Sequence, residues 1–113
     1  MDSKEIFNFA SQIAKKSKEN ENADLSELVE IGFEKKDLNK EEKHSMRAPN
    51  ELYTMHGDDG NKVEVKNYAY DPTKAFGTIE PDINKIYAWL YDENDKKIDE
   101  YHVWFSDKPY GSK

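Results

Sequence analysis

The sequence predicts an α+β fold in which two or three N-terminal helices pack on one face of a C-terminal antiparallel sheet of about four strands. Apolar residues recur at three- and four-residue spacing before residue 33, which is typical of amphipathic helices. After residue 51, aromatic and β-branched runs are separated by polar turns, which is typical of β-hairpins. A chain of 113 residues is expected to form a single domain.

The helical part is expected to cover residues 1–33. Its first helix, over residues 3–18, begins with the spacing of a capping box, Asp2 with Glu5. The apolar stripe of this helix comprises Ile6, Phe9, Ala10, Ile13 and Ala14. A second capping box, Asp24 with Glu27, opens a shorter helix whose apolar positions are Leu25, Leu28, Val29 and Phe33.

Residues 34–50 are expected to form either a polar surface helix, over residues 40–46, or a linker between the helical and β halves. From residue 34 to Pro49 only Leu38, Met46 and Ala48 are apolar. With so few apolar side chains, this segment can pack only weakly against the rest of the chain. Its local stability should therefore be low.

The antiparallel sheet is expected to cover residues 51–106. Its first hairpin has a five-residue loop at residues 57–61, which pairs Met55 with Val63 and Tyr53 with Val65 and gives one apolar face. The connection over residues 71–83 is long for so small a domain, and long loops are often functional. Residues 107–113 are expected to be a loose tail.

The second hairpin is the most informative part of the chain. Residues 84–91 and 98–105 flank a charged turn at residues 92–97. Seven of the fourteen aromatic residues lie beyond residue 84: Tyr87, Trp89, Tyr91, Tyr101, Trp104, Phe105 and Tyr110. One face of two strands cannot bury so many large side chains, so some of them must face something other than the core.

Two registers of this hairpin are open, and the loop length decides between them because a slip of one residue exchanges the faces. A loop of two or four residues makes a core face of Phe105 and the pairs Ile86–Val103, Ala88–Tyr101 and Leu90–Asp99. The other face then carries the pairs Lys85–Trp104, Tyr87–His102, Trp89–Glu100 and Tyr91–Ile98. A loop of three or five residues pairs Trp89 with Tyr101 and Tyr87 with Val103, and the aromatic residues become core.

We favour the first register because its core face is aliphatic, while its other face has the composition of a recognition surface. In the alternative, both sheet faces are covered, one by the helices and the other by the long loop or by a second subunit.

The chain shows no pattern that indicates catalysis or metal binding. His44, His56 and His102 lack metal-ligand spacing, and cysteine is absent. The acidic turns at residues 58–61 and 92–95 do not fit a calcium loop. The serines lack the setting of a nucleophile, and no glycine-rich phosphate loop occurs. We therefore expect no enzymatic activity, no metal and no cofactor.

The net charge of −7 is unevenly distributed. Residues 1–50 hold nine Lys/Arg against eleven Asp/Glu, and residues 51–113 hold eight against thirteen. An acidic field repels nucleic acid and anionic membranes and favours a basic protein partner. The early acidic residue and the absence of a long apolar run exclude a secretory signal and a membrane span, so a cytoplasmic location is expected.

These observations favour a non-enzymatic, acidic protein-binding module. It would be an inhibitor or immunity-type protein that engages a basic partner, for example a nuclease, and could mimic the charge of nucleic acid. The expected binding residues on the sheet are Tyr87, Trp89, Tyr91, Glu100, His102 and Trp104. The expected carboxylate rim in the loops is Asp58, Asp59, Asp92, Glu93 and Asp95, with Asp99 on the last strand.

Two alternatives remain at this point. One is a small-ligand site or enzyme with a pocket between the 71–83 loop and the sheet, lined by Tyr68, Tyr70, Tyr87, His102 and Trp104. The other is a homodimer in which the aromatic face is simply the subunit interface.

Overall fold

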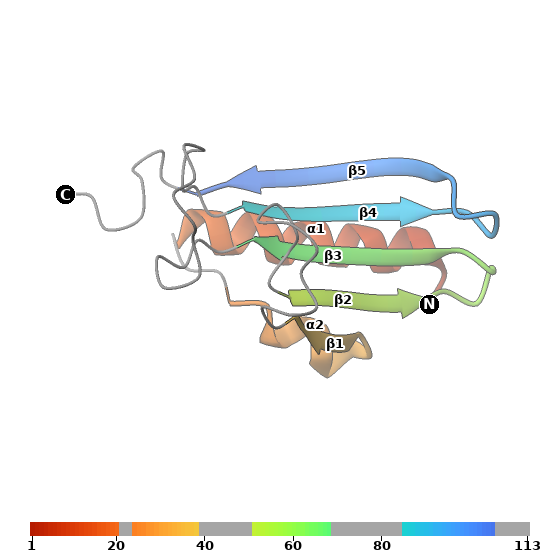
Figure 1. Cartoon of the computed structure of the whole chain (residues 1–113), viewed down its shortest axis with the longest axis horizontal. Coiled ribbons are helices and arrows are strands. Elements are labelled where there is room, and N and C mark those ends of the chain that lie inside the picture. Colours follow the sequence, from red (N-terminus) through yellow and green to blue (C-terminus); the bar gives the residue numbers. More distant parts are fainter. Residues whose placement is uncertain (21–23, 39–50, 69–84, 106–113) are drawn as a thin grey trace.

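The computed structural model describes residues 1–20, 24–38, 51–68 and 85–105. Within these ranges there are two helices, α1 (Ser3–Glu19) and α2 (Ser26–Ile31). The five strands are β1 (Glu34–Asp37), β2 (Glu51–His56), β3 (Lys62–Tyr68), β4 (Lys85–Tyr91) and β5 (Lys97–Trp104). They form one antiparallel sheet in the order β1-β2-β3-β4-β5, and both helices lie on the same side of it (Figure 1). The predicted α+β class is confirmed, with five strands in place of about four.

The additional strand is β1, which lies where a polar helix or linker was expected. Its four residues pair antiparallel with β2, and Lys36, for example, lies opposite Leu52. All four side chains of β1 are charged and exposed, so no alternation of apolar and polar residues marks it as a strand. Its conformation follows from pairing with β2 rather than from its own residues. The helix expected over residues 40–46 lies outside the described residues.

α1 begins at the predicted capping box. The side chain of Asp2 accepts a hydrogen bond from Glu5 N at 2.8 Å, and the side chain of Glu5 accepts one from Asp2 N at 3.3 Å. Phe9, expected in the buried stripe, is 38% exposed, and Phe7 is buried in its place. The observed stripe is Ser3, Ile6, Phe7, Ala10, Ile13, Ala14 and Ser17. Phe9 lies three residues from Ile6 and four from Ile13, but at about 100° per residue it sits about 100° around the helix from Ala10, the middle of the stripe, and the buried residues all lie within about 60° of Ala10.

α2 lacks the predicted capping box. Leu25 is its N-cap residue and makes no side-chain cap, while Asp24 Oδ1 accepts hydrogen bonds from Ser26 N at 3.1 Å and Ser26 Oγ at 2.7 Å. Val29, expected on the apolar side, is 47% exposed. The helix ends at Gly32, whose φ of 124° suits glycine.

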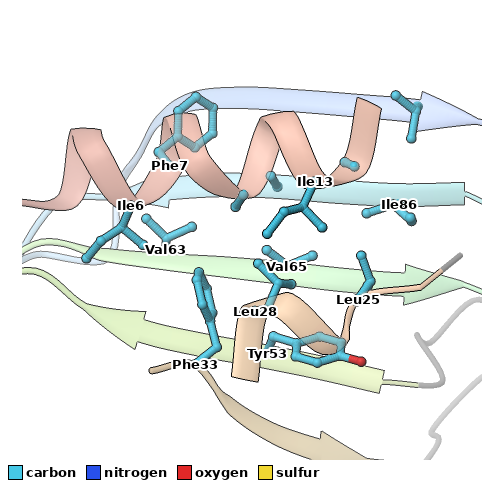
Figure 2. Close-up of a cluster of buried hydrophobic side chains, with 14 of the residues drawn as sticks. Ile6, Phe7, Ile13, Leu25, Leu28, Phe33, Tyr53, Val63, Val65 and Ile86 are labelled. Carbon is cyan, nitrogen blue, oxygen red and sulfur yellow. The ribbon is translucent and has the colours of Figure 1, made fainter. Parts of the chain in front are cut away.

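The core lies between the helices and one face of the sheet (Figure 2). Ile6, Leu28, Val63, Val65 and Ile86 are fully buried there. α1 packs over β3, β4 and β5, and α2 lies beside β2 (Figure 1). Aliphatic side chains therefore fill most of the core face of β3 and β4, and buried Asn67 is the polar exception on β3.

Both predicted hairpin registers are confirmed over most of their length. Met55 pairs with Val63 and Tyr53 with Val65, as the five-residue loop requires. In the second hairpin, Ile86 pairs with Val103 and the ladder continues in the favoured register to Leu90 opposite Asp99. Asp99 is nevertheless exposed on the outermost strand, and Tyr101 is only partly buried against the core.

The end of the second hairpin differs from the prediction. Tyr91 pairs with Lys97 rather than Ile98, so the loop has five residues, 92–96. A five-residue loop alone would give the other register, with an aromatic core. The register shifts between Leu90 and Tyr91, which leaves Ile98 as an extra residue on β5. This bulge restores the favoured register, and the aromatic side chains of β4 face away from the helices.

Candidate functional site

The candidate site is the open face of the sheet, by which we mean the face turned away from the helices. Strand pairing aligns its side chains in four rows that cross the strands. The first row is Tyr68, Lys85 and Trp104. The second row is Lys36, Leu52, Lys66, Tyr87 and His102. The third row is Glu34, Thr54, Glu64, Trp89 and Glu100. The fourth row is His56, Lys62, Tyr91 and Lys97.

Aromatic rings form a continuous ladder along β4 on this face. The ring centroids of Tyr87 and Trp89 are 5.9 Å apart, and those of Trp89 and Tyr91 are 6.0 Å apart. Tyr68 of β3 meets Tyr87 edge-on at 5.6 Å, and the ring of His102 on β5 lies 5.5 Å from that of Tyr87. Edge-to-face contacts of this kind hold the rings in defined orientations. The structure therefore brings the predicted sheet residues together on one face.

Lysine side chains lie over these rings; the favoured register placed Lys85 opposite Trp104, as observed, but the other lysines were not anticipated. The ammonium groups of Lys66 and Lys97 lie 4.0 Å and 4.6 Å from the ring centroid of Trp89. Lys85 lies 5.3 Å from the centroid of Trp104, and Lys62 lies 5.5 Å from that of Tyr91. These distances are within the range of cation–π attraction. The i, i+2 spacing of Lys62, Glu64 and Lys66 is the sequence signal that could have placed both charge signs on this face.

Carboxylates and lysines of the open face also form ion pairs. Glu100 accepts a hydrogen bond from Lys97 Nζ at 2.7 Å and lies 3.1 Å from His102 Nδ1. The hydrogen bond from Lys97 is the largest effect that lowers the pKa of Glu100. On β3, Lys62 Nζ lies 3.7 Å from Glu64. Burial lowers the pKa of Lys66, because the charged ammonium is partly removed from water.

The loop carboxylates of the predicted rim mostly have other partners. Asp59 Oδ2 accepts hydrogen bonds from Ser3 N and Ser3 Oγ, and Asp58 Oδ2 lies 3.5 Å from the amino group of Met1. Asp92 Oδ1 accepts hydrogen bonds from Asn94 N and Lys96 N within its own turn.

Two further acids of the rim lie in the turn of the second hairpin. Asp95 pairs with Lys62 of the open face, with 3.0 Å between Oδ1 and Nζ. Glu93 is exposed, and its carboxylate lies close to Gly60 of the neighbouring loop. The acidic loops therefore gather at one end of the sheet, and among the described rim residues only Asp95 has an ion pair with a residue of the open face.

Two features bear on what this face can bind. Trp104 of the open face is 48% exposed, and Ile98, the bulge residue of β5, is 54% exposed, so large apolar groups of this edge strand meet solvent. The side chain of His102 is also 48% exposed, so the described residues do not enclose it in a deep pocket. Tyr70 and residues 71–83, which would complete the alternative ligand pocket, lie outside the described residues.

Among the described residues, no group of three or more His, Cys, Asp or Glu side chains is placed to hold a metal ion. Neither α1 nor α2 is long and apolar enough to cross a membrane, among the parts of the chain that the structure describes. Comparisons of the chain with models of protein families, with curated proteins and with solved structures found no match.

Proposed function

We propose that the protein is a non-enzymatic protein-binding module and that the open face is its contact surface. The observation that carries this proposal is the aromatic ladder of β4 together with Trp104. The core is already filled from the other side, where Ile86 and Ala88 of the same strand are fully buried. The large aromatic side chains are thus not needed to build the core, and aromatic groups of this kind are enriched where proteins bind one another.

The charged residues of the open face limit which charge a binding partner can carry. Lys62, Lys66, Lys85 and Lys97 lie among the aromatic rings and Lys36 lies in the second row, so a uniformly basic partner would meet five ammonium groups. A uniformly acidic partner would meet Glu64 and Glu100. The partner that fits this face carries both signs of charge, arranged opposite the rows.

An inhibitor or immunity-type role is compatible with this proposal. The chain has a net charge of −7, which speeds the approach of a basic protein over distances longer than a contact. The acidic loops at the end of the sheet would guide that approach, and the mixed charges of the open face would then fix the orientation. The exposure of His102 favours a binding surface over an enclosed ligand site.

The test uses Trp104→Ala, because Trp104 is half exposed and its removal should leave the fold intact. A partner is first captured on the wild-type protein, identified by mass spectrometry and purified. We expect Trp104→Ala to weaken its affinity at least about tenfold, as truncation of an interface tryptophan often does. The measurement is calorimetric titration, with circular dichroism to verify the fold.

The matched control is Phe9→Ala, which removes an exposed aromatic ring from α1, on the helical side of the sheet. This variant should bind the partner with the affinity of the wild type. Equal binding by Trp104→Ala and wild type, or an equal loss in Phe9→Ala, would place the contact surface elsewhere.

A further inference from the structure

In the second and third rows of the open face, the residues that carry charge lie on the same alternate strands, β1, β3 and β5. In the second row, Lys36 and Lys66 lie on β1 and β3, and His102 lies on β5. In the third row, the same three strands carry Glu34, Glu64 and Glu100. One basic and one acidic stripe therefore run side by side across the whole sheet.

We propose that a second copy of this chain binds the open face, stacked face to face about a two-fold axis that crosses the strands between the second and third rows. The proposal rests on the proposed function, since it names an occupant of the same surface. Two sheets can stack in this way about 10 Å apart, with their strands nearly aligned.

This axis exchanges the second row with the third. Each strand then lies antiparallel over its own copy, and Lys66 faces Glu64 of the second copy. Lys36 faces Glu34 and His102 faces Glu100 in the same way. A two-fold axis along β3 would instead place Lys66 on Lys66, so the charges select the axis that crosses the strands.

The aromatic residues agree with the same axis. It places Tyr87 against Trp89 of the second copy, at the centre of the face. It also exchanges the first row with the fourth, which brings Lys85 to Tyr91, Lys62 to Tyr68, and Lys97 to Trp104. Each of these contacts joins an ammonium group to an aromatic ring, the pairing that the lysines already make within one copy.

The area of the face is sufficient for a modest dimer. The rows hold three, five, five and four side chains, 17 in all. With about 4.8 Å between strands and about 6.8 Å between rows, two such faces bury about 1,100 Å² in total, just above the roughly 1,000 Å² of a specific interface. We therefore expect a concentration-dependent dimer rather than a permanent one.

The test is a charge swap measured by sedimentation equilibrium. In Lys66→Glu, residue 66 faces the Glu64 carboxylate of the second copy; in Glu64→Lys, residue 64 faces the Lys66 ammonium. Each variant alone should dimerise at least about tenfold more weakly than the wild type, since like charges then meet at the centre of the interface. An equimolar mixture should recover a heterodimer, and the double variant K66E/E64K should recover the homodimer. Lys15→Glu, an exposed position on α1, changes the net charge as Lys66→Glu does and should weaken the dimer far less than Lys66→Glu.

Several outcomes would overturn this inference. A wild type that is monomeric at millimolar concentration would do so, and so would single variants that dimerise like the wild type. The single variants could also dimerise weakly while neither the mixture nor the double variant recovers dimerisation, and this result would count against the proposed axis. None of these results affects the proposed function if Trp104→Ala still weakens binding of a different protein, so the two can fail separately.

Discussion

The residue with the most consequential hydrogen bonds outside the open face is Glu51. It accepts hydrogen bonds from the Tyr53 hydroxyl at 3.0 Å and from Asn67 Nδ2 at 2.7 Å, and its carboxylate lies 3.1 Å from Lys35 Nζ. Tyr53 and Asn67 are both buried on the helical side of the sheet. The carboxylate thus satisfies two buried donors at the polar end of the core, where an unpaired group would be costly.

We expect Glu51→Gln to lower the free energy of unfolding by about 1–3 kcal/mol, because an amide cannot accept from all three donors while keeping its own hydrogens paired. Urea denaturation followed by circular dichroism measures the change. Glu30→Gln removes an equal charge from an exposed position on α2 and should alter stability by less than about 0.5 kcal/mol. Equal effects of the two substitutions would show that the Glu51 hydrogen bonds do not stabilise the fold.

The same residue predicts a dependence of stability on pH. Burial raises the pKa of Glu51, but the hydrogen bonds from Asn67, Lys35 and Tyr53 outweigh burial and leave the pKa lowered. A carboxyl whose pKa is lower in the folded state contributes stability above its unfolded pKa and loses it as the pH falls through the folded pKa. Between about pH 5 and pH 3 the wild type should therefore lose more stability than Glu51→Gln. Parallel losses in the two proteins would contradict this.

At the scale of elements, the loop between β2 and β3 holds the first turn of α1. Ser3, which is buried, donates from its backbone N and its Oγ to Asp59 Oδ2, at 3.2 Å and 2.7 Å. The loop and the start of α1 approach so closely that a Cβ at Gly57 would lie 2.5 Å from Ser3 N. Only glycine, which has no Cβ, fits at this position without a clash. A contact between residues this far apart in sequence ties the helix to the sheet.

Ser3→Ala should lower the free energy of unfolding by about 1 kcal/mol, because it removes a hydrogen bond that joins two elements. Ser11→Ala is a matched control: its Oγ donates at 2.8 Å to Phe7 O within the same helix. Such local bonds add little, and alanine favours the helix, so this variant should be neutral or slightly more stable. Thermal unfolding of both variants gives the comparison, and a neutral Ser3→Ala would show that the contact with the loop is dispensable.

At the scale of the whole molecule, the net charge opposes self-association, and the local charges of the open face favour it. Two copies that each carry −7 repel one another at long range, while the rows attract at contact. Salt screens the long-range repulsion more than it weakens contacts that exclude water. Self-association should therefore strengthen as ionic strength rises from about 0.01 M to about 0.15 M.

Binding to a basic protein should instead weaken over the same range, because salt then screens an attraction. Sedimentation at the two ionic strengths measures self-association, and calorimetric titration measures binding of a captured partner. A dimer that weakens steadily with added salt would argue against the balance of charges inferred for the open face.

Patterns within one segment predicted most of the fold, and contacts between distant segments account for what the sequence missed. The alternation along β3, β4 and β5, together with the aliphatic composition of one face, favoured the observed registers and placed Tyr87, Trp89 and Trp104 on one face, although the second loop has five residues rather than two or four. β1 has no such pattern, because its conformation comes from β2. The lysines over the rings and the pairing of Asp59 with Ser3 depend on how side chains meet in space, which spacing along the chain does not specify.

Because of the bulge at Ile98, the second hairpin can lose one residue of β5 and still keep the same side chains on each face. In a ladder without a bulge, losing one residue within a strand inverts the faces of everything beyond it. Here the deletion of residue 98 would leave Tyr91 opposite Lys97 and Leu90 opposite Asp99 in an unbroken ladder. The aromatic surface can therefore persist through a deletion at this bulge during the evolution of the chain, while the loss of one residue within β3, whose ladders with β2 and β4 are unbroken, would turn one of Val63 and Val65 toward solvent.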